Sequence, residues 1–364
     1  MTTQHDMAVR HLVDTFREPY LGMELGLAKA VVGVDASQPD VKVQLRLGFP
    51  AKRYGVELAQ SLSEQIRSLD GVRSVDVQVD WRVESQAVQG NLRPVQSIRN
   101  IVAVASGKGG VGKSTTAANL ALALALEGAA VGLLDADIYG PSQPRMMGLG
   151  GQRPVSPDQK SMLAPEAYGI KVMSIGFLID EEQPMVWRGP MVTQALIQLL
   201  ETTRWGELDY LIVDMPPGTG DIQLTLSQRV PVSGAVIVTT PQDIALLDAR
   251  KGLRMFQKVE VPVLGIIENM STHICSNCGH EEHIFGAGGG RRMAEQYGVD
   301  LLGELPLDIR IREQMDGGKP TVVADPDGSL GRAYLDLARR TAAQLARRSL
   351  APSPAFPSIQ VEDT

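Results

Sequence analysis

The segment that decides the fold of this chain is Gly107-Lys108-Gly109-Gly110-Val111-Gly112-Lys113-Ser114-Thr115, which matches the phosphate-binding pattern G-x-x-x-x-G-K-[ST]. The apolar run before it, residues 101–105, predicts a buried parallel strand, and the Ala- and Leu-rich residues 113–127 predict a helix. A glycine-rich loop between such a strand and helix turns backbone N–H groups around a phosphate at the positive end of the helix. We therefore predict that all nine residues of this segment bind a nucleotide.

The two lysines of the loop have different predicted tasks. Lys113 places a positive charge beside the β- and γ-phosphates, and the hydroxyl of Ser114 is a ligand for Mg²⁺. Lys108 follows the first glycine and is separate from the lysine that serves the chain's own phosphates. It is either a solvated loop lysine or, as we expect, a group that stabilises developing charge on a nucleotide bound to a second copy of the chain, as an arginine finger does.

The composition of the chain argues against several classes of protein. Its 364 residues suffice for two domains, and 43% apolar with 21% charged residues indicates a globular, soluble protein. A net charge of −7 argues against nucleic-acid binding. No apolar run reaches the ~18 residues of a membrane span, and residues 1–7 lack the plan of a signal peptide. Because its two cysteines cannot make a disulfide framework, we expect a cytoplasmic protein with no membrane partner.

Hydrophobic patterning divides the chain into four segments. Residues 1–83 show the order helix, strand, strand, helix, strand, which predicts a small α+β domain, and the polar residues 84–97 predict a linker. Residues 98–349 alternate strands and helices and predict a doubly wound α/β domain with a mostly parallel sheet, whose ligand lies at the carboxyl ends of the strands. Residues 350–364, with three prolines and an acidic end, predict a disordered tail.

Within the larger domain the pattern places each element along the chain. The predicted strands are 101–105, 130–135, 210–214, 234–239, 262–267 and 299–303. The predicted helices are 113–127, 190–203, 243–258, 287–297 and 330–348. The last helix carries several arginines beside an alanine-rich face, and we expect it to pack on the sheet rather than lie on a lipid surface.

Polar residues follow three of the predicted strands. Asp135 and Asp137 come at the end of strand 130–135, where one carboxylate would hold the water shell of Mg²⁺ and the other would orient or deprotonate the attacking water. Asp214 ends the next strand along the chain and occupies the position of the second carboxylate that orders Mg²⁺. Asn269 follows strand 262–267, where its amide would bond an adenine edge or would only form a turn.

A pair of cysteines, Cys275 and Cys278, is separated by two residues, which places two thiols on one tight loop. Such a pair suits a metal, and the chain holds no second pair. His280 and His283 would complete a zinc site within the chain, although their short spacing strains a tetrahedron. Alternatively, two chains would each supply two thiolates to a [4Fe–4S] cluster across a two-fold axis, or the cysteines would bind no ligand.

These features together resemble the Mrp/ApbC family of iron–sulfur cluster carrier ATPases, within the deviant phosphate-loop class of the MinD and ParA ATPases. The resemblance covers residues 97–348 and rests on four blocks, which are 107–115, 135–142, 214–221, and 268–271 followed by the C-x-x-C pair. The second block and the C-x-x-C pair are specific to the carriers. Residues 1–83 resemble, more loosely, a SufT/PaaD-like module, and because they contain no cysteine we assign them no cluster ligand.

The resemblance implies a homodimer that holds a labile [4Fe–4S] cluster between paired C-x-x-C loops, hydrolyses ATP slowly and transfers clusters to apo iron–sulfur proteins, with cluster-assembly scaffolds as further partners. It implies these roles: Lys108 as the intersubunit lysine, Lys113 as the phosphate lysine, Ser114 as the Mg²⁺ ligand, Asp137 as the water-orienting residue, Asp214 as the carboxylate that holds Mg²⁺ through water, and Cys275 and Cys278 as cluster ligands. Two alternatives share the nucleotide site: a MinD/ParA-like switch with a structural metal or none, and a scaffold in which nucleotide only stabilises a dimer.

Overall fold

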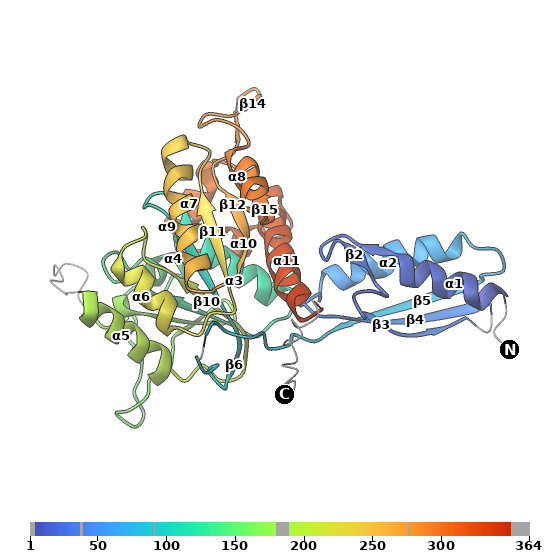
Figure 1. Cartoon of the computed structure of the whole chain (residues 1–364), viewed down its shortest axis with the longest axis horizontal. Helices are drawn as coiled ribbons and strands as arrows, with labels where there is room; N and C mark the ends of the chain where they lie inside the picture. Colours follow the sequence, from blue (N-terminus) through green and yellow to red (C-terminus); the bar gives the residue numbers. More distant parts are fainter. Residues whose placement is uncertain (1–3, 37–38, 91, 180–188, 276, 351–364) are drawn as a thin grey trace, which may run out of the picture.

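The computed structural model describes residues 4–36, 39–90, 92–179, 189–275 and 277–350. An elongated small domain lies beside a larger domain in which helices cover a central sheet (Figure 1). The predicted tail lies outside the described residues except for Leu350, which is the last residue of helix α11 (Ser329–Leu350).

The small domain packs two helices against a three-stranded sheet. Its elements are α1 (Gln4–Thr15), β1 (Arg17–Glu18), β2 (Met23–Glu24), β3 (Val31–Asp35), β4 (Asp40–Leu47), α2 (Tyr54–Arg67) and β5 (Ser74–Trp81). Strand β4 lies in the middle, antiparallel to β3 and parallel to β5, and every second residue of β4 is buried because one face of the sheet is covered. The predicted order of helices and strands is confirmed, whereas β1 and β2 are too short to leave a pattern.

The larger domain contains an eight-stranded sheet in the order β15-β12-β11-β6-β10-β7-β9-β8, in which all neighbours are parallel except β8 and β9. Its strands are β6 (Ile98–Ser106), β7 (Val131–Asp135), β8 (Glu166–Ala167), β9 (Ile170–Ser174), β10 (Leu208–Asp214), β11 (Gly234–Thr239), β12 (Val263–Glu268) and β15 (Leu301–Glu304). The predicted doubly wound, mostly parallel sheet is confirmed.

The helices of this domain are α3 (Lys113–Leu126), α4 (Gln143–Met146), α5 (Gly189–Thr202), α6 (Asp221–Arg229), α7 (Asp243–Lys258), α8 (Gly289–Tyr297), α9 (Ile309–Asp316), α10 (Thr321–Ala324) and α11, with a short 3₁₀ turn η1 (Ile175–Phe177). Helix α11 packs against α3 and β15 with a largely buried apolar face, as expected (Figure 1). Strands β8 and β9 and helices α4, α6, α9 and α10 are additions to the prediction, because their short or polar sequences carry no sustained period.

The segment predicted as a linker lies on the larger domain. Gln89 is buried, and its Nε2 donates to the carbonyls of Ser227 and Val230, each at 2.7 Å. Its Oε1 accepts from the Val232 N–H at 2.9 Å. The backbone N–H of Gln86 donates to the side chain of Asn100 on β6 at 3.0 Å. Polar composition therefore predicts the absence of helix and strand here, but not that two glutamines would fix the segment in place.

A buried ion pair of the larger domain, between Glu127 and Arg339, lies where the two domains meet at the carboxyl end of α3. Glu127, the residue after α3, accepts a hydrogen bond from Arg339 Nε of α11 at 2.7 Å. Its second oxygen accepts from the backbone N–H groups of Arg53 at 2.9 Å and Tyr54 at 3.1 Å, both in the small domain. Arg339 also pairs with Glu57 of α2 at 2.9 Å. The small domain is thus docked on the end of the same helix that begins at the phosphate loop.

Candidate functional site

The phosphate loop, residues 107–112, connects β6 to α3. Gly110 and Gly112 have φ angles of +81° and +82°, in the left-handed region that favours glycine. A Cβ at Gly107 would lie 2.1 Å from the backbone carbonyl carbon of Asp248 on α7, so the loop's close approach to that helix requires glycine. The loop lines a cavity of about 220 Å³ that also includes residues following β7 and β10, such as Asp137 and Pro217.

A buried lysine and carboxylate meet at this cavity. Lys113 Nζ lies 2.5 Å from Oδ1 of Asp214, which is fully buried at the end of β10, and 3.2 Å from Ser114 Oγ. The other oxygen of Asp214 accepts from Gln143 Nε2 at 2.9 Å. The structure therefore brings together the residues predicted as phosphate lysine, Mg²⁺ ligand and second carboxylate, and adds a glutamine that no sequence motif singles out.

The two carboxylates at the carboxyl end of β7 have different environments. Asp135 is fully buried, and burial raises its pKa to about 7, with the charge of Asp214 as a second cause. At 3.0–3.2 Å it accepts hydrogen bonds from four donors, the backbone N–H groups of Asp137, Ser142 and Gln143 and the hydroxyl of Ser174. Asp135 therefore shapes the segment 135–143, whereas Asp137 lines the cavity and burial raises its pKa.

Two other predicted residues lie at the edges of the loop. Asn269 is buried after β12, and its Nδ2 donates to the carbonyl of Val111 at 2.9 Å, so its amide braces the loop. The predicted contact of this amide with an adenine edge stays a prediction. Lys108 is partly exposed and lines the cavity.

The oxygen atoms around the cavity suit Mg²⁺. The hydroxyl of Ser114 and the carboxylates of Asp137 and Asp214 are hard ligands of the kind that this ion prefers. Ser142 Oγ, on the cavity wall, is buried and finds no hydrogen-bond partner among the residues that the structure describes. A buried oxygen of this kind fits a hydrated cation or a phosphate beside it.

The C-x-x-C pair lies between β13 (His273–Ile274) and β14 (Glu281–Glu282), which form a hairpin that projects at the top of the larger domain in Figure 1. The Cys275 N–H donates to the His280 carbonyl, and the Gly279 N–H donates to the Cys275 carbonyl, both at 2.9 Å. Backbone N–H groups of Cys278 and Asn277 lower the pKa of the Cys275 thiol. Since the thiolate is the metal-binding form, this turn favours ligation.

The histidines of the zinc alternative are directed elsewhere. His283 Nδ1 is hydrogen-bonded to the carbonyl of Ser271 at 2.8 Å, and His280 Nε2 lies 4.0 Å from Glu282. Within the described ranges, no group of three or more His, Cys, Asp or Glu side chains is arranged to hold a metal ion. The assignment of Cys275 and Cys278 as cluster ligands stays a prediction.

Comparison with known proteins places the chain in a family. A family profile described as "ParA: NUBPL iron-transfer P-loop NTPase" matches residues 97–342. This chain belongs to that family. An "Iron-sulfur cluster carrier protein" of Pseudomonas fragi is 61% identical over 278 residues, which cover 76% of this chain and 97% of the relative. The protein of the same name from Escherichia coli (strain K12) is 52% identical over 330 residues, covering 91% and 89%.

A solved structure agrees with this membership. The nucleotide-binding protein of Archaeoglobus fulgidus in complex with ADP is 40% identical, with a TM-score of 0.55, and the match covers 61% of this chain and 88% of that one. The predicted resemblance to the iron–sulfur carriers and the phosphate-loop fold are confirmed. The profile match begins at residue 97, so the likeness of residues 1–83 to a SufT/PaaD-like module stays a prediction.

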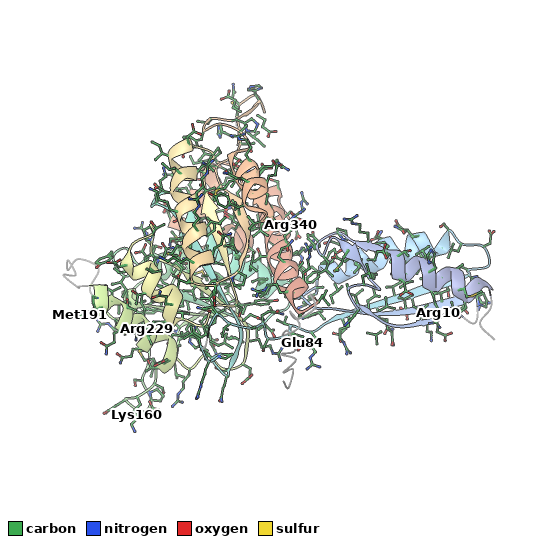
Figure 2. The ribbon with its side chains drawn as sticks, in the orientation of Figure 1. Arg10, Glu84, Lys160, Met191, Arg229 and Arg340 are labelled. Carbon is green, nitrogen blue, oxygen red and sulfur yellow. The ribbon has the colours of Figure 1, made fainter. Side chains whose placement is uncertain are left out.

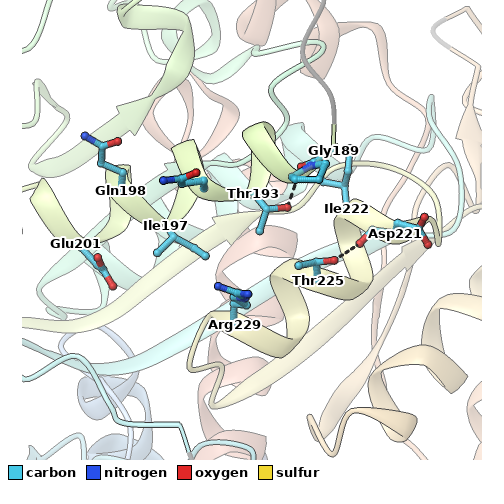
Figure 3. A pocket seen from close by; sticks show the side chains of 11 residues that line it. Gly189, Thr193, Ile197, Gln198, Glu201, Asp221, Ile222, Thr225 and Arg229 are labelled. Atoms are coloured by element: carbon cyan, nitrogen blue, oxygen red, sulfur yellow. Dashed lines mark hydrogen bonds between the residues drawn. The ribbon is translucent and has the colours of Figure 1, made fainter.

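A larger cavity of about 850 Å³ lies between α5 and α6, away from the phosphate loop. In Figure 3, Thr193, Ile197 and Glu201 on α5 face Thr225 and Arg229 on α6. None of the predicted site residues lines it, so cavity size does not identify the nucleotide site of this family member. None of the described helices combines the length and the apolar character needed to span a membrane.

Proposed function

We propose that this protein is an iron–sulfur cluster carrier that binds and slowly hydrolyses Mg²⁺–ATP as a homodimer and transfers a [4Fe–4S] cluster, held between two subunits, to apo-proteins. The observation that carries the proposal is the pair Cys275 and Cys278 at the tip of a projecting hairpin on a nucleotide-binding fold. A four-iron cluster takes about four thiolate ligands. Two such hairpins related by a two-fold axis supply that number.

Exposed apolar side chains support pairing of two chains. Ile244 and Leu247 on α7 are 70% and 53% exposed, and α7 contacts the phosphate loop through Asp248. Ile274 and Ile284, on either side of the C-x-x-C turn, are 57% and 51% exposed. A second copy covering these side chains would bring Lys108 to the partner's nucleotide and the two hairpins toward each other.

The residues around the cavity fit a hydrolytic role. Lys113 would leave Asp214 for the β- and γ-phosphates, and Ser114 and Asp214 would hold Mg²⁺, which offsets the negative charge of the phosphates when bound. Asp137 would orient the attacking water, and its raised pKa makes its carboxylate a stronger proton acceptor. The Lys108 ammonium would stabilise the charge that develops in the partner's site.

The first experiment is anaerobic reconstitution with iron and sulfide. We expect about four irons per dimer, with the visible absorption of a cluster, in the wild type and none in the Cys275→Ala/Cys278→Ala variant. The matched control is His280→Ala/His283→Ala, which should retain the cluster. Tightly bound zinc at about one per chain without iron uptake would instead support the MinD/ParA-like switch with a structural metal.

A mixing experiment tests the role of Lys108 across the dimer. Lys108→Ala and Lys113→Ala chains should each have little ATPase activity alone. In a mixed dimer, the site of the Lys108→Ala chain has its own Lys113 and receives Lys108 from the other chain. One of the two sites of a mixed dimer is complete, and random exchange in an equimolar mixture makes about half of the dimers mixed. Activity should therefore return on mixing, toward about a quarter of the wild-type rate. If mixing restores nothing, Lys108 acts within its own chain or not at all.

A further inference from the structure

Gln143, the first residue of α4, is fully buried between the phosphate loop and β10. Its Nε2 donates to the carbonyl of Ser114 at 3.0 Å and to Asp214 Oδ2 at 2.9 Å. Both partners are acceptors, which fixes the nitrogen of the amide on this side. The other amide atom, Oε1, is buried and has no hydrogen-bond partner within the part of the chain that the structure describes.

This contact joins three segments of the site. The backbone N–H of Gln143 is held by Asp135, its side chain reaches the first turn of α3 at Ser114, and it ends on the carboxylate that terminates β10. An apolar side chain of similar size would fill the same space without an unpaired oxygen. Burying the Gln143 amide with one unpaired oxygen costs stability, so we expect the side chain to have a role beyond filling space.

We propose that Gln143 is a positioning residue for ATP hydrolysis, which fixes the orientation of Asp214 relative to Ser114; this rests on the proposed Mg²⁺–ATP chemistry of the site. Asp214 has two oxygens, one held by Lys113 and one by Gln143. Lysine is a point charge on a flexible stem, and it is also the group expected to turn to the phosphates. When Lys113 turns, Gln143 is the contact that keeps the Asp214 carboxylate in place.

The test compares wild-type protein with Gln143→Leu and Gln143→Met, which keep the volume and remove the donor. Fluorescent ADP binding is titrated with Mg²⁺, and ATPase kinetics are measured beside it. Partners of metal ligands commonly contribute ten- to hundredfold to metal affinity or activity. We expect the Mg²⁺ concentration for half-maximal binding to rise about tenfold and kcat to fall about tenfold, with KM changed less than about threefold. Binding of ADP in EDTA should be unchanged.

Gln223→Leu is the matched control, because Gln223 on α6 is also buried and both of its amide atoms lack partners within the described residues, but it does not line the phosphate cavity. It should leave the Mg²⁺ titration unchanged. If a folded Gln143→Leu or Gln143→Met variant titrates like the wild type, the positioning role is wrong. If wild-type binding is itself independent of Mg²⁺, both this inference and the proposed Mg²⁺–ATP chemistry fail. If wild-type ADP binding depends on Mg²⁺ and the Gln143 variants show the same dependence, only the positioning role of Gln143 is overturned.

Discussion

Removing Arg339 should weaken the docking of the small domain more than any exposed charge on the same helix. The Arg339 side chain is 8% exposed, and its partner Glu127 is 1% exposed. Breaking a buried pair from one side costs about 3–5 kcal/mol, because the remaining charge stays buried. Glu127 keeps two backbone N–H donors after the substitution, which places the cost at the low end of this range. The contact of Arg339 with the exposed Glu57 adds less than about 1 kcal/mol. We therefore expect Arg339→Met to lower the free energy of domain separation by about 3 kcal/mol.

The assay is urea unfolding followed by tryptophan fluorescence. Trp81 of β5 lies close to Gly128, where the domains meet, since a Cβ on that glycine would lie 2.7 Å from the indole ring. The transition that separates the domains should therefore change the Trp81 signal. Arg339→Met should lower the free energy of that transition by about 3 kcal/mol. The variant Arg339→Met/Glu127→Gln should recover at least about 1 kcal/mol, because it removes the unpaired charge.

Arg340→Met is the matched control. Figure 2 labels Arg340 on α11, where this helix faces the small domain. Its guanidinium lies 5.8 Å from the Tyr20 ring, the same distance as that of Arg339, but its ion pair with Asp336 is largely exposed. We expect a loss below about 1 kcal/mol. If Arg339→Met costs no more than Arg340→Met, the contacts of Arg339 with Glu127 and Glu57 do not hold the small domain in place.

Two further predictions concern the phosphate loop and the small domain. Gly112→Ala should abolish ADP binding in calorimetry, because its Cβ would lie 2.1 Å from Asn269 Nδ2 at a φ of +82°. The control Gly109→Ala, which has open space around it, should keep the ADP affinity within about threefold. Equal losses of affinity in both variants would contradict the bracing contact of Asn269 with the loop. A hydrogen bond from Arg73 lowers the pKa of Asp40 from the ordinary 3.8 to about 2. The stability that this contact contributes is therefore fully present above pH 3.8 and is lost as the pH falls toward 2. Melting temperatures of Asp40→Asn should show a smaller loss between pH 4 and about 2 than those of the wild type, and parallel curves would refute this.

The sequence predicted those parts of the fold that have strong local signals. Continuous apolar runs predicted β6, β7, β10, β11 and β12, because strands covered on both faces must be apolar throughout. Strand β9, Ile-Lys-Val-Met-Ser, is interrupted by a lysine whose Nζ is bound by the carbonyl of Trp205 at 2.7 Å. This contact depends on a residue 34 positions away in the chain, so the local sequence does not predict it.

The site shows the same division between local and distant information. The phosphate-loop pattern is local, so it predicted where Lys113 and Ser114 would lie. The contacts of Asn269 with Val111 and of Gln143 with Asp214 join residues separated by 158 and 71 positions. Their geometry depends on the register of parallel strands, which a single sequence does not specify. The sequence therefore indicated candidate groups, while the structure shows which of them brace the loop and which face the cavity.

Helix α3 connects the site to the rest of the molecule. It begins at Lys113, and Glu127 follows its last residue, so about 21 Å of helix separates Lys113 from the ion pair at the domain boundary. A shift of the loop end of α3 would be carried to the end on which Arg53 and Tyr54 are docked. The Arg339→Met substitution and a nucleotide bound at the phosphate loop would thus act on opposite ends of one helix. If nucleotide stabilises the docked arrangement, the domain-separating transition should move to higher urea with ADP, and Arg339→Met should reduce that shift.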